Sequence, residues 1–309
     1  MNTRTTDTLL RPFAEIDRLI RGEGYASAAA VARTTRYHDA LAVEAPLCLQ
    51  AATALLERRG GRIVLYTGFV VPELFPQGEN DGPLGTVALA RALQRTGFSP
   101  SVHVDRELVD TTRWLAAELG CEMPIVPIRI DTPPPCDVAI AIEKPGANAE
   151  GVLHTFDGRR IEGGSQPIDA LFTELSDRGV LTLAVGDVGN ELGFGGLSDL
   201  VRRLLPDGGR CRCGCGSGIA AAASANLLVP AAVSNWGAYG IAAALAVLAR
   251  EPQAALLASE EERMLRVAAV RGCRDGVRRR GVYGVDGIVG DLSVRLVESI
   301  LDLVNAAMT

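Results

Sequence analysis

Short, uninterrupted apolar runs recur along this chain and alternate with longer segments of helical periodicity. Residues 63–67, 138–142 and 180–185 are the clearest of these runs. A strand that is apolar on both faces is buried on both faces, which is typical of a parallel sheet covered by helices. The pattern predicts an α/β fold with a mostly parallel sheet, helices on both of its faces, and a site at the C-terminal ends of the strands.

The helical segments predict how the chain is organised. Amphipathic helices are expected over residues 11–21 and 39–59, and the second ends at Gly60-Gly61, as helices often do. No internal repeat or clear domain boundary interrupts the 309 residues. We therefore predict a single α/β domain over residues 1–309, with a helical segment of about residues 1–60 packed on it.

Charge and hydropathy disfavour two classes of partner. The formal net charge of −6 argues against nucleic acid as the main partner. The most apolar zone, residues 219–249, is interrupted by Asn226, Pro230 and Gly237, so it lacks the roughly 20 uninterrupted residues of a membrane helix. We expect a cytoplasmic protein that binds neither nucleic acid nor membranes. A homo-oligomer is possible, because the sequence does not fix the oligomeric state.

The chain has seven cysteines, an odd number without a secretory signal, which predicts free thiols in a reducing compartment. Cys211, Cys213 and Cys215 form a C-x-C-x-C run, and an extended segment places all three on one face. Three thiolates could begin a zinc site, but such a site needs a fourth ligand that the sequence does not reveal. The alternative is a glycine-rich loop with small buried thiols.

Lys144 is the only lysine among the 31 basic residues, and it directly follows the apolar run 138–142 and Glu143. An ammonium is a compact charge that can lose its proton when buried, whereas a guanidinium is a broad fork that stays charged. Lys144 is therefore a candidate to bind a carboxylate, stabilise an oxyanion or form a Schiff base. The alternative is a lysine that survives by chance on a surface loop.

The loop after the run 180–185 is the strongest candidate for chemistry. It reads Gly186-Asp187-Val188-Gly189-Asn190-Glu191-Leu192-Gly193-Phe194-Gly195, and its glycines allow a ligand to approach the backbone closely. Two carboxylates and an amide within five residues can bind an ammonium, ligate a divalent cation or act in acid–base catalysis. The alternative is a turn that caps the next helix. The glycine spacing matches neither a Rossmann nor a Walker motif, so no nucleotide cofactor is expected.

Other loops that follow apolar runs carry similar residue types. Asp81 precedes Pro83 and is predicted to cap the helix that this proline opens. His154 could shuttle a proton, although a lone histidine is more often a hydrogen-bonded structural residue. A further group follows the run 227–233 and consists of Ser234, Asn235 and Trp236.

These loops carry motifs that occur in a fixed order over roughly residues 11–303. They are Thr67-Gly68-Phe69 with Glu79-Asn80-Asp81-Gly82-Pro83, Glu143-Lys144-Pro145-Gly146-x-Asn148 with His154, Gly186-Asp187-x-Gly189-Asn190-Glu191-x-Gly193-x-Gly195, Val233-Ser234-Asn235-Trp236-Gly237-x-Tyr239, and Val285-Asp286-Gly287. Together they resemble the D-glutamate cyclase family. Val188 and Phe194 depart from the glycine and the methionine-like residue usual in that family, and the Cys211–Cys215 run is not part of its pattern.

The resemblance implies a lyase that reversibly dehydrates D-glutamate to 5-oxo-D-proline by intramolecular amide formation. It implies catalytic roles for Lys144, which would neutralise a carboxylate or the oxyanion, and for His154. Asp187 or Glu191 would bind the amine and accept its proton. The residues that would bind the substrate are Glu143, Asn148, Gly186, Gly189, Asn190, Ser234, Asn235, Trp236 and Asp81. A divalent cation, Mn²⁺ or Mg²⁺, held by Asp187, Glu191 and either Glu79 or Asp81, is the alternative Lewis acid.

Three other interpretations stay open at the level of sequence. The chain could be a different hydro-lyase or a racemase of a small carboxylate. It could also be a non-catalytic binding protein for an acidic amino acid, since a zwitterion is recognised by the same groups. A pyridoxal-phosphate enzyme built on Lys144 is less well supported, because no phosphate-binding cup is visible in the sequence.

Overall fold

The computed structural model describes residues 3–41 and 45–309, and its centre is a six-stranded sheet in which every strand pairing is parallel. The strand order is β3-β2-β1-β4-β5-β6. The strands are β1 (Arg62–Thr67), β2 (Ser99–Val104), β3 (Ile125–Pro127), β4 (Val138–Ile142), β5 (Leu181–Gly186) and β6 (Leu227–Pro230). The predicted α/β fold with a parallel sheet is confirmed.

The strands are apolar on both faces because the sheet is covered on both. In the register of the central strands, Leu65 lies between Val102 and Ile140. The side chains of Ile63, Leu65 and Ile140 belong to the main core on one face. Alternate positions of the same strands, such as Val64 and Ala139, belong to a second core on the other.

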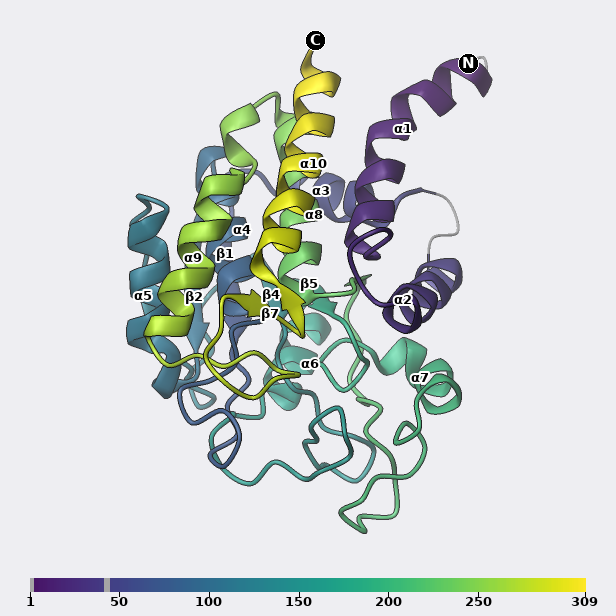
Figure 1. Ribbon diagram of the computed structural model, residues 1–309, viewed down its shortest axis with the longest axis vertical. Helices are drawn as coiled ribbons and strands as arrows, with labels where there is room; N and C mark the ends of the chain where they lie inside the picture. The colour runs from purple at the N-terminus through teal and green to yellow at the C-terminus, as the bar shows by residue number, and fades with distance from the viewer. Residues whose placement is uncertain (1–2, 42–44) are drawn as a thin grey trace.

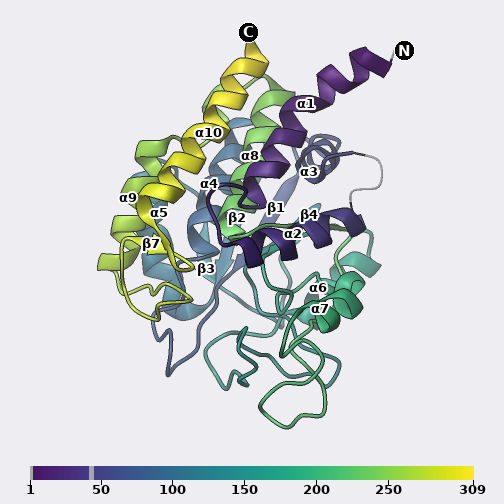
Figure 2. The ribbon, with the colours of Figure 1, turned by 45° about the vertical axis from the view of Figure 1, so that its right-hand side comes forward.

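The main core lies between the sheet and a thick layer of helices. This layer consists of α1 (Thr3–Ile20), α3 (Leu47–Leu56), α4 (Pro83–Arg95), α5 (Val109–Glu118), α8 (Ser234–Ala249), α9 (Ala258–Val270) and α10 (Gly290–Met308), with the short 3₁₀ turns η1 (Arg106–Leu108) and η3 (Pro252–Ala254). Helix α8 is buried on nearly all sides. Helices α1, α8 and α10 run side by side, and both ends of the described chain lie opposite the long loops (Figures 1 and 2).

The opposite face is covered more thinly. Helix α6 (Asp169–Asp177) packs Leu171 and Phe172 on this face of the sheet. Helix α7 (Ser198–Leu204), preceded by η2 (Gly195–Leu197), packs Val201 beside Tyr37 of α2 (Ala28–Leu41). The prediction of helices on both faces is therefore confirmed. No helix in the described ranges is long and apolar enough to span a membrane.

The prediction of one helix over residues 39–59 is wrong. The structure has α2 ending at Leu41 and a separate α3 starting at Leu47. Pro46 immediately precedes α3, with φ −52° and ψ 139°. Proline lacks an N–H and disfavours helical backbone at the residue before it, and the ψ of Pro46 is itself not helical, so the helix begins only after it. Helix α2 was not predicted, because its alanine-rich sequence shows little contrast between an apolar and a polar face.

A small hairpin near the C-terminus was not predicted. Strands β7 (Gly284–Val285) and β8 (Ile288–Val289) pair in antiparallel fashion. The two residues of the turn, Asp286 and Gly287, have φ values of 47° and 77°. Positive φ at both central residues is the mark of a type I′ turn, for which Asp-Gly is a preferred pair. The hairpin carries Asp286 toward the loops that follow the sheet strands.

Candidate active site

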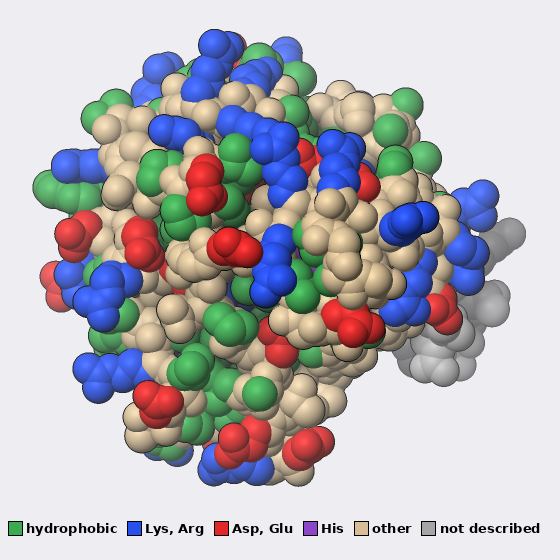
Figure 3. All heavy atoms as spheres, turned by 90° about the horizontal axis from the view of Figure 1, so that it is seen from below, with side chains coloured by type: hydrophobic (Ala, Val, Ile, Leu, Met, Phe, Trp, Pro, Cys, Tyr) green, Lys and Arg blue, Asp and Glu red, His purple; other side chains and the backbone are tan. Residues whose placement is uncertain are grey.

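The strand order reverses between β1 and β4, and this is the position at which doubly wound sheets bind ligands. A cavity of about 510 Å³ lies beside these strand ends. Its polar wall comes from the loops after β1, β4 and β5, with one side chain each from α2 and the β7–β8 turn: Glu79, Glu143, Asp187, Glu191, Arg33 and Asp286. Its apolar wall includes Phe69, Phe75 and Phe156. Figure 3 views this loop end, where acidic, basic and apolar side chains are interspersed.

Three buried carboxyl groups meet in the wall of the cavity. Glu143 directly follows β4, whereas Asp187 and Glu191 follow β5. One oxygen from each lies within 4.8 Å of the other two. Glu143 has a φ of 45°, in the left-handed region that residues other than glycine seldom occupy. This backbone conformation, held by the hydrogen bond from the Glu143 N–H to the Val185 carbonyl (3.0 Å), turns the chain at the strand end.

The electrostatics of the group favour protonated carboxyls. Burial raises the pKa of Glu143 well above its usual value, and the negative charges of Glu191 and Asp187 raise it further. Burial also raises the pKa of Glu191, with Asp187 as the next cause. Such a cluster holds protons at neutral pH, or it holds a cation in their place.

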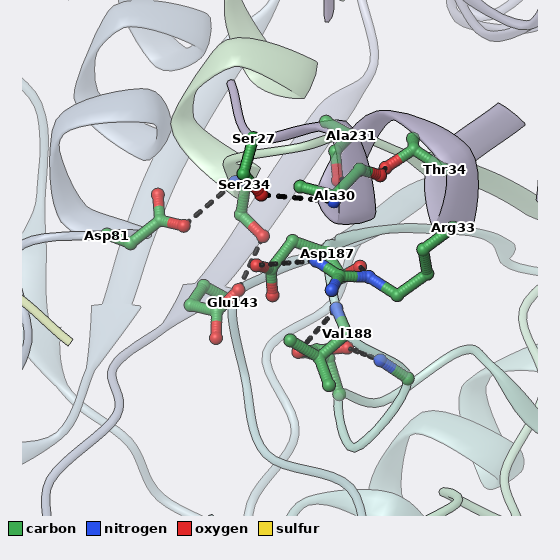
Figure 4. A network of polar contacts seen from close by, with 12 residues as sticks. Ser27, Ala30, Arg33, Thr34, Asp81, Glu143, Asp187, Val188, Ala231 and Ser234 are labelled. Carbon is green, nitrogen blue, oxygen red and sulfur yellow. Dashed lines mark hydrogen bonds and ion pairs between the residues drawn. The ribbon is translucent and has the colours of Figure 1, made fainter. Parts of the chain in front are cut away.

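Asp187 differs from its neighbours because a basic residue faces it. The Arg33 guanidinium, reaching over from α2, lies 3.7 Å from the carboxylate, and its Nε donates to the Asp187 carbonyl at 3.0 Å (Figure 4). Burial raises the pKa of Asp187, and the charge of Arg33 opposes that rise. Asp187 is therefore the member of the group whose ionised form has a charged partner.

The glycine-rich loop is shaped around the carboxylate of Glu191. Its two oxygens accept hydrogen bonds from the N–H groups of Val188 (3.2 Å) and Gly189 (2.6 Å). Gly189 has a φ of 118°, which favours glycine. A Cβ on Gly186 would lie 2.9 Å from the Glu191 side chain, so the first glycine leaves room for this carboxylate.

A second acidic group adjoins the first. Glu79 and Asp286 line the cavity, and burial raises the pKa of each well above its usual value, with Asp81 as the next cause for both. Burial raises the pKa of Asp81 to about 7. Asp81 itself does not line the cavity.

The prediction that Asp81 caps the helix opened by Pro83 is wrong. Its carboxylate instead accepts the N–H groups of Ser234 (2.8 Å) and Asn235 (2.7 Å), at the start of α8. The orphan N–H groups of that helix end supply these donors. Ser234 in turn donates its hydroxyl to the Glu143 carboxylate (2.5 Å), which connects the two acidic groups (Figure 4).

Asn190 offers a free acceptor to a ligand. Its amide nitrogen donates to the His154 carbonyl at 2.9 Å. Its buried Oδ1 has no hydrogen-bond partner among the described residues, and Asn190 lines the cavity. A buried unpaired acceptor in a cavity wall is suited to an N–H group of a ligand.

Lys144 is fully buried in an internal ion pair. Its Nζ lies 2.6 Å from the carboxylate of Asp105 and 3.3 Å from the Gly68 carbonyl. It is not one of the residues that line the cavity. The Lys144 ammonium therefore contacts buried groups of the protein and not the cavity, and its catalytic role stays a prediction.

Several other predicted residues support the loops without lining the cavity. The Trp236 indole donates to the Ser293 hydroxyl (2.8 Å) in the core. Asn148 accepts the N–H groups of Glu150 and Val152 at 3.0 Å each, which orders the loop before His154. The imidazole of His154 faces the thiols of the C-x-C-x-C run and not the acidic group.

Three charged residues of the cavity wall, Arg33, Arg279 and Asp286, were not predicted as site residues. Arg33 lies 154 positions from Asp187, and no pattern in the sequence connects them. A pattern in the sequence could have identified Asp286. The Asp-Gly pair is typical of a tight turn, and it lies in one of the motifs that resemble the D-glutamate cyclase family. Arg279 lies 2.8 Å from the Asp157 carboxylate, and no pattern in the sequence connects these two residues either.

The fold and the site together define a doubly wound α/β protein with an acidic cavity at its topological switch point. Comparison with known proteins is specific: the family described as "D-glutamate cyclase-like, C-terminal" matches residues 29–301. The chain belongs to this family. A human protein named "D-glutamate cyclase, mitochondrial" is 29% identical over 308 residues, which cover 84% of this chain and 48% of the human protein. The chain thus spans about half the length of this relative.

Proposed function

We propose that the protein is a lyase that interconverts D-glutamate and 5-oxo-D-proline plus water. The observation that carries the proposal is the convergence of Glu143, Asp187 and Glu191 in one buried cavity, next to Arg33. The cavity volume of about 510 Å³ is ample for an amino acid. Membership of the D-glutamate cyclase-like family supports the same substrate class.

The reaction needs acid and base groups in one place. The α-amine must lose a proton before it attacks the γ-carboxyl carbon, and a carboxyl oxygen must then leave as water. In the complete reaction, two ammonium protons leave with that oxygen, so the protein returns to its starting protonation. Asp187, whose ionised form Arg33 stabilises, is suited to accept the amine proton. Glu143 or Glu191, with a raised pKa, is suited to protonate the departing oxygen.

Other residues of the wall fit the remaining parts of the substrate. Arg33 and Arg279 are the basic side chains among the described lining residues, and they suit the two substrate carboxylates. The unpaired Oδ1 of Asn190 suits the amine. These contacts would hold the flexible glutamate chain in a cyclic conformation with its ends close together.

The acidic group also fits a hard divalent cation. Glu143, Asp187 and Glu191 supply three buried oxygen ligands, and Arg33 lies close enough to Asp187 to offset part of their charge. Glu79 lines the same cavity but lies outside this three-residue group. Bound Mn²⁺ or Mg²⁺ would supply a Lewis acid that polarises the γ-carboxyl group.

The test is to incubate the chelated, folded protein with D-glutamate, L-glutamate or 5-oxo-D-proline, with and without Mn²⁺ or Mg²⁺, and to separate the products by chiral chromatography. We expect turnover of the D-compounds. Glu191→Gln should lower it by roughly 100-fold or more, because a general acid–base group typically contributes that much. Glu73→Gln changes an exposed carboxylate outside the cavity and should leave turnover intact.

Two other results would point to the alternative functions. Conversion of a different small carboxylate would favour another hydro-lyase or a racemase. Thermal stabilisation by D-glutamate without any product would favour a binding protein. Absence of both turnover and binding in a folded sample contradicts the proposal.

A further inference from the structure

Three thiols and one imidazole meet at a point separate from the acidic group. Cys211, Cys213 and Cys215 lie in the loop between α7 and β6, and His154 lies in the loop between β4 and α6. One donor atom from each residue lies within 4.8 Å of the other three. His154 is 59 positions from Cys213 and 61 from Cys215, so only the tertiary fold brings the four together.

The separations between the donor atoms suit ligands around one small cation. The sulfur of Cys211 lies 3.2 Å from that of Cys213 and 3.4 Å from that of Cys215. Nε2 of His154 lies 3.2 Å and 3.8 Å from the sulfurs of Cys213 and Cys215. Tetrahedral zinc, with bonds of about 2.3 Å to sulfur and 2.0 Å to nitrogen, places a sulfur and a nitrogen roughly 3.5 Å apart and two sulfurs roughly 3.8 Å apart. All seven cysteines are free, so no disulfide accounts for the cluster.

The hydrogen bonding of His154 prepares its ring to bind a metal. Nδ1 lies 3.0 Å from the carbonyl oxygen of Val152, which can only accept a hydrogen bond. Nδ1 is therefore the donor in this contact, and Nε2 is the ring nitrogen that faces the thiols. A metal-bound histidine is commonly held by this type of carbonyl contact on its other nitrogen.

Asn148 forms hydrogen bonds both with the loop that carries the thiols and with the segment that carries His154. Its amide nitrogen donates to the sulfur of Cys215 (3.3 Å) and to the carbonyl of Gly218 (2.8 Å), on the thiol loop. Its amide oxygen accepts two backbone N–H groups in the segment before His154. A hydrogen bond donated to sulfur stabilises a thiolate, which is the form that binds metal.

We propose that His154, Cys211, Cys213 and Cys215 bind one zinc ion in a closed structural site. Four protein ligands complete a tetrahedron and leave no open position for a substrate. Soft thiolate ligands select zinc over Mg²⁺ and Mn²⁺, so this site differs in preference from the oxygen-rich acidic group. The proposal does not depend on the reaction that the cavity performs.

The proposed zinc site would link a long loop to a segment that lines the cavity. The loop between α7 and β6 has no helix or strand over residues 205–226, and a loop of this length is uncommon without an added constraint. Zinc would join it to the segment that carries Thr155 and Phe156 into the cavity lining. The His154 carbonyl also accepts a hydrogen bond from the side-chain amide of Asn190, which lines the cavity. His154 is therefore connected to the cavity wall both through this bond and through the residues that follow it in the chain.

The test is to purify the untagged full chain without chelator and to measure its zinc content by mass spectrometry. We expect about one zinc ion per chain, with nearly complete loss in Cys213→Ser and in His154→Ala. Cys136→Ser is the matched control, because Cys136 is a half-buried thiol outside the group, and it should keep the zinc. Glu191→Gln should also keep it, which separates this site from the acidic group.

A second measurement keeps the test decisive if the variants fold poorly. The zinc-free wild-type protein is titrated with Co²⁺, and thiolate-bound tetrahedral cobalt should give intense visible absorption that added zinc abolishes. Folded, fully reduced wild-type protein that retains no zinc and gives no such absorption would overturn the proposal. A disulfide among the three thiols in freshly prepared protein would overturn it as well.

Discussion

Asp81 and Asn235 cap each other's helix. The Asp81 carboxylate, just before α4, accepts the N–H groups of Ser234 and Asn235 at the start of α8. The Asn235 side-chain oxygen accepts the N–H groups of Gly82 (2.9 Å) and Gly85 (2.7 Å) at the start of α4. The two helices therefore begin at a common point, and that point lies beside the acidic cavity.

This exchange predicts a strong effect of either residue on stability. Asp81→Ala should lower the free energy of unfolding by roughly 2–4 kcal/mol, because it leaves the buried N–H groups of Ser234 and Asn235 without an acceptor. Asn235→Ala should lower it by roughly 1–3 kcal/mol, because the Gly85 N–H loses its acceptor while the Gly82 N–H keeps a bond to Asp81. Urea denaturation measures the change. The double variant should lose less than the sum of the two, since both act at one junction. Asp199→Ala, on the exposed first turn of α7, should change stability by about 0.5 kcal/mol or less, and an equal loss there would contradict the assignment.

The buried carboxyls predict how stability depends on pH. The folded protein keeps a proton on Glu143 at pH values where the unfolded chain, with the ordinary carboxyl pKa of 4.5, has released it. The contribution of Glu143 to the free energy of unfolding is thus fully present at low pH and is lost as the pH rises toward the pKa of this group in the folded protein. We expect the free energy of unfolding of chelated wild-type protein to fall more steeply from pH 6.5 to 8 than that of Glu143→Gln.

Urea midpoints at several pH values test this difference in slope. The three histidines are present in both proteins, so their titration cancels when the two slopes are compared. Glu73→Gln, exposed on the surface, should retain the wild-type slope. Identical slopes in wild type and Glu143→Gln would show that Glu143 is ionised in the folded protein.

The Lys144–Asp105 pair predicts that this lysine matters for folding. Lys144→Met should lower stability by about 3–5 kcal/mol, because it leaves a buried carboxylate without its partner. Lys144→Met combined with Asp105→Leu should recover most of that loss. Arg178→Met removes an exposed ion pair and should cost roughly 0.5 kcal/mol or less. Lys144→Arg that folds and turns over at the wild-type rate would refute the predicted catalytic role.

Arg33 predicts a shift in the pH dependence of activity, given the proposed reaction. Its charge opposes the rise in the pKa of Asp187, so Arg33→Met should raise that pKa further. If Asp187 accepts the amine proton, the acidic limb of kcat/KM should move to higher pH. Arg36→Met removes the same charge from an exposed position of α2 and should leave the profile in place. An unmoved acidic limb in Arg33→Met would remove Asp187 from this role.

The sheet was predictable because its signal is local. A strand such as β4 is buried on both faces, so its five residues are uniformly apolar and their limits can be read directly. Helix limits were less clear where proline interrupts an otherwise helical pattern, as Pro46 does before α3. The rarity of lysine likewise directed attention to a side chain that is fully buried.

The contacts that complete the sites were not predictable from spacing. Periodicity relates residues on one element, whereas Arg33 and Asp187 come from elements 154 positions apart. For the same reason the sequence could not identify Asp105 as the partner of Lys144, or His154 as the fourth donor beside the three thiols. Each of these pairings depends on how loops from separate strands meet, and that is decided by the packing of the whole domain.

The cavity wall begins earlier in the chain than the family match does. Tyr25 and Ser27 line the cavity, and the family match starts at residue 29. The Tyr25 hydroxyl also lies 2.8 Å from that of Ser299 on α10, so the two ends of the domain are joined by a polar contact. A fragment trimmed to the matched residues would lose Tyr25, Ala26 and Ser27 from the wall of the cavity. Anyone isolating the corresponding half of a longer relative should place the cut upstream of α1.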